Sequence, residues 1–354
     1  MADAVVLITG AGAPGIAGTI YALKENPERK TFRIISTDID ENAVGKYLTD
    51  VFYQVPSPEN EDYLPSLEEI VKSENIDIII PQTTREILVL AENVDHFRYL
   101  GAEVVVSPAV SIKTANDKYL LLERAKEINI PCPKYYLTDS ETTLREAADL
   151  LGYPRKKAVV KPRISHGMRG LRILSEESWD VDRLLSSKPD GLEIGLDYLV
   201  QILSRGKWPQ LIVSEYLPGE EYTIDVFRGS RCVVIPRKRL KIRSGISFDA
   251  EVDLREDLIE YSTRLAVALD LKYCFGFQFK MAGDGIPKLL ECNPRVQGTM
   301  GASMMAGFNP IYYAVMEALG TPAAVDGIEI KNGTRFVRYW GGVGVSEGRV
   351  IGKI

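Results

Sequence analysis

The N-terminal third of the chain alternates short apolar runs with segments of helical periodicity. The runs AVVLIT, FRIIST, IDIIIP and EVVVSP are rich in β-branched residues and too short to be helices. Between them, helices are expected from about Pro14 to Lys24, near Leu64 to Ser73 and from Arg85. Because a parallel pair of strands requires a long crossover connection, strands that alternate with helices form parallel sheets. The sequence predicts a doubly wound parallel sheet over residues 1–113.

A second part, residues 114–205, is predicted to form a small α/β lobe. Its first helix opens at Asp117-Lys118 and ends before Pro131, because proline cannot continue a helix and disfavours it in the preceding residue. The runs KAVVKP and LRIL and a helix around 178–187 complete this lobe.

The third part, residues 206–354, is predicted to contain longer antiparallel strands. Its strands are the runs LIVSEYL, EYTIDVF, RCVVIPRK, CFGFQFKM and PKLLECN, with a helix over 255–269 among them. The turn Gly283-Asp284-Gly285 indicates a hairpin between the last two. Residues 334–340 form a further strand that would cover the mouth of a site or an oligomer interface. The predicted fold class is α/β, with a doubly wound sheet followed by two α+β lobes.

The bulk composition excludes several classes of function. The chain has 354 residues, a formal net charge of −6, four cysteines and two histidines. The negative charge argues against bulk attraction to nucleic acid or anionic membranes, and no apolar run approaches the roughly 20 residues that span a bilayer. The cysteines form no CxxC pair, and two histidines leave little for a His-based metal site or triad. We expect a cytoplasmic enzyme whose chemistry relies on carboxylates, Lys, Arg and backbone groups.

A glycine-rich turn follows the first expected strand. Gly10, Gly12 and Gly15, with Asp38 at the end of the second strand, satisfy the dinucleotide fingerprint. Taken alone, this pattern favours an NAD(P)-dependent oxidoreductase. A tight strand-to-helix turn needs glycines whatever it binds, however, and many doubly wound sheets carry such turns without a dinucleotide. We therefore keep the oxidoreductase as an alternative, and whether the turn binds a ligand stays open.

A lysine and two strands with oxygen-bearing side chains indicate the chemistry of the site more specifically than the glycine-rich turn does. Lys161 ends an apolar strand before a glycine-containing loop, where it would neutralise phosphate charge; a solvated lysine on a surface hairpin is the alternative. In two adjacent strands of alternating polarity, Gln278, Glu291 and Asn293 would point to one face. Such oxygen ligands suit Mg²⁺, which also bridges substrate phosphates, although a structural hydrogen-bond network would use the same residues.

Five motifs occur in one order along the chain. They are Asn116-Asp117-Lys118, VVKP with its loop, SEYLPGEEYTIDV, FGFQFK and LECNPRVQGTMGASMMAGFNP. This ordered set resembles the ATP-grasp superfamily, most of all a single ATP-grasp unit of the carbamoyl phosphate synthetase large subunit. The resemblance spans about residues 5–320, because the N-terminal sheet is similar to the domain that precedes an ATP-grasp fold. In this interpretation, 114–205 is the small lobe and 206–354 the large lobe.

The resemblance implies an ATP site and a metal site. The nucleotide would be bound by Lys118 and Lys161 at the phosphates, Gly167 and Met168 in the loop over them, the backbone of Glu215, Tyr216 and Leu217 at adenine, and Glu221 at the ribose. Mg²⁺, or Mn²⁺ in its place, would be held by Gln278, Glu291 and Asn293. Arg295 would stabilise the transferred phosphoryl group or an acyl phosphate, with Lys161 and Arg243 as further catalytic cations. Arg243 belongs to a basic run whose alternative interpretation is a solvated strand.

The implied activity is ADP-forming ligation of a small carboxylate to an amine or similar nucleophile. The loop carries Ile164, His166, Met168 and Arg169, where carbamoyl phosphate synthetases are richer in glycine. The second ATP-grasp half and the glutaminase partner of those enzymes are missing from this chain, so phosphorylation of bicarbonate or carbamate is kept as an alternative. A nucleotide-binding regulator without turnover is another. The expected partners are small molecules, with a homodimer compatible and neither nucleic acid nor membrane involved.

Overall fold

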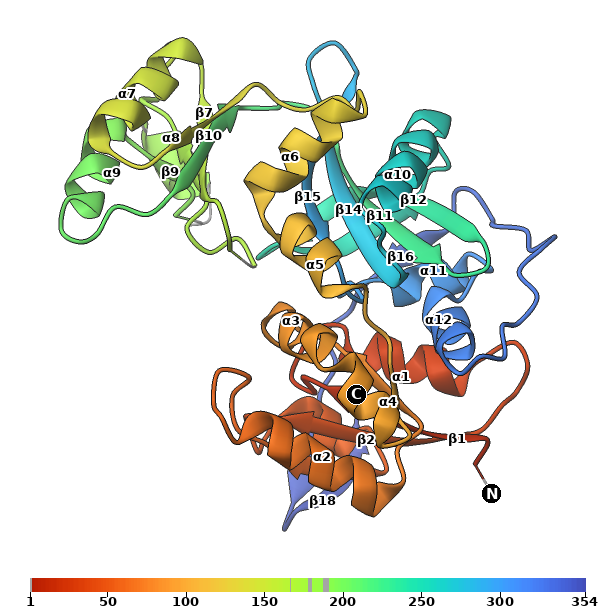
Figure 1. Cartoon of the computed structure of the whole chain (residues 1–354). Helices are drawn as coiled ribbons and strands as arrows, with labels where there is room; N and C mark the ends of the chain where they lie inside the picture. Colours follow the sequence, from red (N-terminus) through yellow and green to blue (C-terminus); the bar gives the residue numbers. More distant parts are fainter. Residues whose placement is uncertain (1, 166, 178–179, 187–190) are drawn as a thin grey trace. The chain divides into compact units, whose positions relative to one another are not determined.

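The structure is a computed structural model that describes residues 2–165, 167–177, 180–186 and 191–354, and Figure 1 shows the chain. The chain divides into two compact units, which are described separately. The larger unit comprises Met1–Ala115, Glu221–Phe279 and Glu291–Ile354, and the smaller unit comprises Asn116–Glu220 and Lys280–Leu290. In the described ranges, no helix has the length and apolar character needed to cross a membrane.

The larger unit begins with a five-stranded parallel sheet in the order β3-β2-β1-β4-β5. Its strands are β1 (Ala4–Thr9), β2 (Phe32–Asp38), β3 (Val51–Gln54), β4 (Ile78–Pro81) and β5 (Glu103–Val104). The helical segments are α1 (Ile16–Lys24), η1 (Val44–Tyr47), α2 (Tyr63–Glu74), α3 (Thr84–Glu92), α4 (Val94–Tyr99) and α5 (Ala109–Asn116). Because side chains alternate along a strand, Val6 and Ile8 join the apolar cluster of α1, whereas Leu7 joins that of α2 to α4. The predicted doubly wound parallel sheet is confirmed.

A second sheet of six strands has the order β15-β14-β11-β12-β13-β16. The strands are β11 (Glu221–Arg228), β12 (Cys232–Arg243), β13 (Ile246–Val252), β14 (Tyr273–Met281), β15 (Pro287–Asn293) and β16 (Arg335–Val337). The helices are α10 (Glu256–Ala268), α11 (Gly301–Met305) and α12 (Pro310–Ala318). Strands β11 to β13 and β16 pair antiparallel. Tyr312 of α12, Phe227 of β11 and Ile20 of α1 belong to one buried cluster, so a single core stabilises both sheets of this unit.

The smaller unit is built on a five-stranded sheet in the order β6-β10-β7-β8-β9. Its strands are β6 (Tyr135–Thr138), β7 (Ala158–Pro162), β8 (Arg172–Leu174), β9 (Glu193–Ile194) and β10 (Leu211–Glu215). Its helices are α6 (Lys118–Glu127), α7 (Glu141–Leu150), α8 (Val181–Ser186) and α9 (Leu196–Leu203). Helix α6 begins as expected at Asp117, whose carboxylate accepts hydrogen bonds from the amides of Tyr119 and Leu120. Most of the core comes from α7, α9 and the central strands.

Several elements differ from the sequence-based expectation. The run EVVVSP gives the two-residue β5, although the Val105 amide still donates to the Ile79 carbonyl at 2.9 Å. The expected strand over 334–340 is limited to β16, and a separate hairpin follows, β17 (Val343–Ser346) and β18 (Arg349–Lys353). Strand β10 pairs with β6 and β7, so it lies in the sheet of the smaller unit, although the sequence analysis counted it with 206–354. The three-part division itself remains a prediction.

Candidate active site

The three predicted metal ligands lie on the neighbouring strands β14 and β15. Along β14, Phe277 and Phe279 are buried and Gln278 between them is half-buried. Along β15 the alternation shifts by one position at Leu290 and Glu291, so that Glu291 and Asn293 are both half-buried. Glu291 and Asn293 are two positions apart and therefore point to the same side of β15. That Gln278 shares their face remains a prediction. Among the described residues, no group of three or more His, Cys, Asp or Glu forms a metal cluster.

Arg295 follows β15 and is held by the N-terminal sheet domain of the larger unit. Its Nε donates to Thr84 Oγ1 at 3.0 Å, and its Nη1 donates to the Val296 carbonyl at 2.8 Å. Burial of the guanidinium lowers the pKa of Arg295, while the nearby carboxylates of Glu291 and Glu86 act in the opposite direction. Thr84 begins helix α3, so this helix end fixes the direction of the arginine.

Helix α3 also carries a buried carboxyl group, Glu86, whose charge acts on Arg295. Glu86 accepts hydrogen bonds from the amides of Gln82 at 3.0 Å and Thr83 at 2.8 Å, which forms a capping box. Burial raises the pKa of the Glu86 carboxyl, and these amide donors oppose the shift. Neither Glu86 nor Thr84 was predicted as a site residue from the sequence. The signal for them was the Thr83-x-x-Glu86 spacing, which is typical of a helix N-terminus.

A buried polar network holds the segment that follows Arg295. Arg237 is 1% exposed and donates to both oxygens of Asp225, at 2.8 Å from Nε and 2.8 Å from Nη2. The same carboxylate accepts Gln297 Nε2 at 3.0 Å and Ser303 Oγ at 2.5 Å. Arg237 Nη1 also donates to Thr299 Oγ1 at 3.1 Å. Asp225 and Arg237 therefore fix residues 297–303 on β11 and β12.

The glycine turn has a packing reason for its small residues. A Cβ atom added to Gly15 would lie 3.0 Å from the Gly298 Cα, and one added to Gly301 would lie 3.3 Å from the Gly18 Cα. Helix α1 thus approaches the 298–301 segment backbone to backbone. Asp38, the candidate ribose ligand of the oxidoreductase alternative, accepts the Gly12 amide at 2.6 Å. These contacts favour a packing role for the turn over a dinucleotide site.

The predicted ribose ligand Glu221 is engaged by an arginine that the sequence analysis did not assign. Arg239 Nη1 forms an ion pair with Glu221 Oε1. Arg239 Nε also donates to Ser247 Oγ at 2.9 Å, and its Nη2 donates to the Gly245 carbonyl at 2.6 Å. Glu221 is thereby connected to the turn between β12 and β13. Arg243 lies at the end of β12, is exposed, and has its Cζ 5.0 Å from the centre of the Phe248 ring.

The smaller unit holds the two predicted phosphate-binding lysines. Lys118 and Lys161 are 5% and 6% exposed, respectively. Lys118 Nζ donates to the Ser165 carbonyl at 3.0 Å and to Ser165 Oγ at 3.3 Å. Lys161 Nζ donates to the carbonyl of Leu290, the residue before Glu291, at 3.1 Å. Both ammonium groups are thus held within the smaller unit by backbone and hydroxyl oxygens.

The loop after Lys161 takes a left-handed backbone. Gly167, Met168 and Gly170 have φ values of 61°, 61° and 77°. A Cβ on Gly170 would lie 2.6 Å from Pro162 Cγ, so only glycine fits there. A turn of this kind can direct backbone N–H groups into a concavity that suits an anion. His166, which the sequence analysis counted in this loop, lies outside the described residues.

The predicted adenine-binding segment lies at the end of β10. Glu215 Oε1 accepts the Lys134 amide at 2.8 Å and Lys288 Nζ at 2.6 Å. The Glu215 amide donates to the Lys134 carbonyl at 2.9 Å, Leu217 is buried, and Lys280 Nζ lies 5.5 Å from the centre of the Tyr216 ring. The Glu215 side chain is therefore engaged by Lys134 and Lys288. The backbone of the residues that follow Glu215 remains the predicted contact for adenine.

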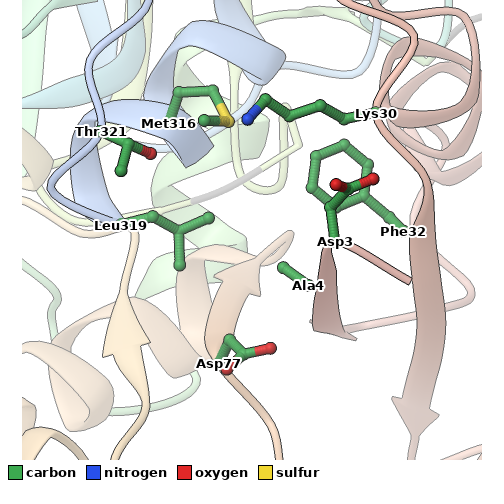
Figure 2. A pocket seen from close by; sticks show the side chains of 8 residues that line it. All are labelled: Asp3, Ala4, Lys30, Phe32, Asp77, Met316, Leu319 and Thr321. Carbon is green, nitrogen blue, oxygen red and sulfur yellow. The ribbon is translucent and has the colours of Figure 1, made fainter. Parts of the chain in front are cut away.

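A hollow of about 250 Å³ lies away from these residues, at the start of β1 in the larger unit. Figure 2 shows Asp3, Lys30, Phe32 and Asp77 around it. One oxygen of each carboxylate is occupied, because Asp77 accepts the Val5 amide and Asp3 accepts the Thr31 amide, each at 2.7 Å. In a parallel sheet, ligands bind beyond the carboxyl ends of the strands, whereas this hollow lies at the amino ends.

Comparison with known families matches two segments of the chain. Residues 207–338 match the family model described as ATP-grasp in the biosynthetic pathway with Ter operon. The chain carries an ATP-grasp domain. Residues 6–105 match the model of the PylC-like N-terminal domain, which corresponds to the parallel sheet that precedes the ATP-grasp domain. The ATP-grasp assignment drawn from the five motifs is confirmed.

The curated relatives are much longer than this chain. The carbamoyl phosphate synthase large chain of Clostridium acetobutylicum is 24% identical over 211 residues, which are 56% of this chain and 18% of the relative. The corresponding large chain of a Thermoanaerobacter species is 26% identical over 235 residues, which are 62% of this chain and 20% of the relative. This ATP-grasp protein thus spans about a fifth of the length of those relatives.

Solved structures share the fold over nearly the whole chain. N5-carboxyaminoimidazole synthetase from Staphylococcus aureus, complexed with ADP, has a TM-score of 0.68 at 16% identity and covers 93% of this chain and 80% of its own. Biotin carboxylase from Campylobacter jejuni has a TM-score of 0.69 at 16% identity, with 92% and 73% covered. The predicted fold class, an N-terminal parallel sheet followed by a mostly antiparallel ATP-grasp sheet, is confirmed.

Proposed function

We propose that this ATP-grasp protein is an ADP-forming ligase that joins a small carboxylate to an amine or similar nucleophile. The supporting observation is the arrangement around β15, where the half-buried Gln278, Glu291 and Asn293 lie on neighbouring strands and Arg295 follows directly. Oxygen ligands followed by a fixed guanidinium suit phosphoryl transfer to an anionic acceptor. The family match and the ADP-bound structural neighbour point to the same reaction class.

The donor set fits a divalent cation that arrives with the nucleotide. Glu291 is its only carboxylate, and Gln278 and Asn293 are neutral. Mg²⁺ retains several waters and is commonly held by one or two carboxylates plus substrate phosphates. When bound, the metal would polarise the γ-phosphoryl group and neutralise its charge. We therefore expect metal affinity to be weak without ATP and to rise when ATP is present.

In the proposed reaction, different residues of the chain have different roles. Lys118 and Lys161 would offset phosphate charge, and the left-handed turn at 167–170 would present amides to it. The carboxylate of the substrate attacks the γ-phosphorus, the bond to the β-phosphate oxygen breaks, and ADP leaves. Arg295, held by Thr84, would stabilise charge on the transferred group. The amine then attacks the acyl carbon of the acyl phosphate, and inorganic phosphate and a proton leave.

A phosphate-release screen tests this function. The full-length protein with Mg-ATP is supplied with small carboxylates, bicarbonate included, and with amines or amino acids, and ADP is distinguished from AMP. We expect release of one phosphate and one ADP per amide formed, with no AMP. Binding of Mg-ATP without phosphate release over the whole panel would support a regulator instead. Tight NAD or NADP binding without ATP binding would support the oxidoreductase.

A further inference from the structure

An exposed aromatic and cationic surface lies at the end of strands β12, β13 and β16. We define the Trp340 platform as Arg243, Phe248, Tyr339 and Trp340. The ring of Trp340 contacts that of Phe248 with 5.0 Å between centroids and 54° between planes. Arg243 Cζ also lies 5.0 Å from the centre of the Phe248 ring. Trp340 is nonetheless 75% exposed and Tyr339 78% exposed, so most of the surface of both aromatic side chains is open to solvent.

The platform combines two recognition chemistries. Exposed aromatic rings stack or make edge contacts with other aromatic rings, which gain more from such contacts than from area burial alone. In the described residues, Arg243 has no carboxylate partner, and its recorded contact is the face of Phe248. A guanidinium stacked on a ring keeps its N–H donors in plane for a carboxylate. A small molecule that carries a ring and an anionic group would contact both the exposed aromatic rings and the Arg243 guanidinium.

The platform is connected to the candidate active site within the larger unit. Arg239 bonds the Gly245 carbonyl and Ser247 in the turn beside Arg243, and it pairs with the predicted ribose ligand Glu221. On the other side, the Arg338 amide donates to the Phe248 carbonyl at 2.7 Å. Arg338 Nη2 donates to the Gly298 carbonyl at 2.9 Å, in the segment that follows Arg295. The platform is thus connected through Arg239 to Glu221, and through Arg338 to the segment that follows Arg295.

We propose that the small-molecule substrate of this enzyme carries an aromatic ring next to its carboxylate, with the ring on Trp340 and the carboxylate at Arg243. This inference rests on the proposed ligase function, because it assigns the substrate class of that site. Trp340 acts as a specificity-determining residue, and Arg243 binds the anion. Tyr339 extends the aromatic surface for a ring system larger than one ring.

A matched pair of probes tests the platform without turnover. Benzoate and cyclohexanecarboxylate have the same charge and nearly the same size, and only benzoate is aromatic. Each is titrated into the full-length protein in the presence of Mg-ADP, with calorimetry and tryptophan fluorescence as readouts. We expect benzoate to bind about tenfold more tightly, the upper range for one aromatic contact. Trp340→Leu should abolish this preference and the fluorescence change, while Trp208→Phe, at the other described tryptophan, should preserve both.

A further variant separates the two chemistries. Arg243→Met should weaken both acids about equally, because it removes the cation and leaves the aromatic surface. The proposal is overturned if the wild type binds the two acids equally, or if Trp340→Leu leaves the preference for benzoate intact. It is also overturned if the wild type shows no preference and Trp340→Leu converts a dimer into a monomer, since the surface is then a self-association interface.

Kinetics distinguish failure of this inference from failure of the proposed function. If aliphatic acids drive phosphate release with a KM that Trp340→Leu does not change, the ligase stands and the platform is wrong. If benzoate binds through Trp340 but no aromatic carboxylate releases phosphate with any amine, the binding surface stands and the ligase activity is wrong. If both are right, aromatic carboxylates support turnover and Trp340→Leu raises their KM about tenfold with little change in kcat.

Discussion

The two units hold their candidate site residues in different ways. In the larger unit, charged groups are paired with one another: Asp225 with Arg237 and Glu221 with Arg239. In the smaller unit, the candidate residue Glu215 is paired with Lys288, and Lys118 and Lys161 donate to backbone carbonyls and a hydroxyl. The pairs differ in burial: the side chains of Arg237 and Asp225 are 1% and 0% exposed, whereas those of Lys288 and Glu215 are 20% and 31% exposed. Because a buried charge depends on its partner much more than an exposed one does, breaking a pair should cost more stability in the larger unit.

The largest effect is expected at the single carboxylate of the proposed metal site. Glu291→Gln removes the charge from that donor set and should lower kcat for phosphate release at least about a thousandfold, since a positioned metal supplies several kcal/mol of charge stabilisation. The matched control is Glu260→Gln, at an exposed pair with Arg264 on α10. Turnover by Glu291→Gln close to that of the control would show that the metal is bound elsewhere.

Breaking the buried pair in the larger unit should be the largest effect on stability. Asp225→Asn leaves Arg237 buried without its carboxylate, which costs about 3–5 kcal/mol of unfolding free energy. Urea unfolding measures this, with Glu260→Gln expected to change stability by less than about 1 kcal/mol. A loss for Asp225→Asn as small as that of the control would mean that the network does not hold 297–303.

Loss of a predicted phosphate-binding cation in the smaller unit should weaken the use of ATP. Lys161→Met removes an ammonium group that donates to the Leu290 carbonyl. We expect a loss of about 10- to 100-fold in kcat/KM for ATP, because the phosphates lose a counter-charge. Steady-state kinetics measure this loss, and urea unfolding of the same samples checks that the variant is folded. An unchanged kcat/KM for ATP in a folded variant would show that Lys161 does not contact the phosphates.

A substitution in the glycine turn, where two backbones pack together, should have a smaller effect on stability. Gly15→Ala places a Cβ 3.0 Å from the Gly298 Cα, so helix α1 must move, at a cost of about 1–3 kcal/mol. Gly206→Ala is the control, because a Cβ there meets nothing within 4 Å. Thermal melts compare the two variants. If Gly15→Ala were as stable as Gly206→Ala but lost affinity for a nucleotide, the turn would be a binding site after all.

The smallest effect is a pH-dependent one at the edge of the large sheet. The side-chain hydrogen bonds from Arg335 lower the pKa of the Asp249 carboxyl below its ordinary value of 3.8. A lowered folded-state pKa gives stability that is present above the unfolded value and is lost as the pH falls through the folded one. Arg335→Ala should therefore lower Tm slightly at neutral pH, and the difference from wild type should shrink below about pH 4. A constant difference would assign the effect to packing.

Much of the framework follows from local patterns in the sequence. Alternation of apolar runs with helical periods predicted the parallel sheet, Asp117 predicted the start of α6, and the order of five motifs predicted the ATP-grasp domain. For the candidate site, the sequence predicted which residues take part and which role each has, but not the contacts that hold them. Those roles remain predictions, as do the domain boundaries.

The partners of the site residues were not predictable, because they are distant in the sequence. Nothing local in the sequence shows that Arg237 pairs with Asp225, or that Arg239 pairs with Glu221.

The sequence by itself determined the type of the main helices and strands of the parallel sheet, the order of the motifs and the chemical groups available, because helical and strand periods and cap signals act over a few residues. Only the tertiary structure decided which charges are neutralised by a partner, why the turn needs Gly15, and that Trp340 lies on Phe248 with its surface open. The physical reason is that strand register and backbone approach bring together groups separated by tens or hundreds of residues. Burial then sets whether each charge is paired or left for a ligand.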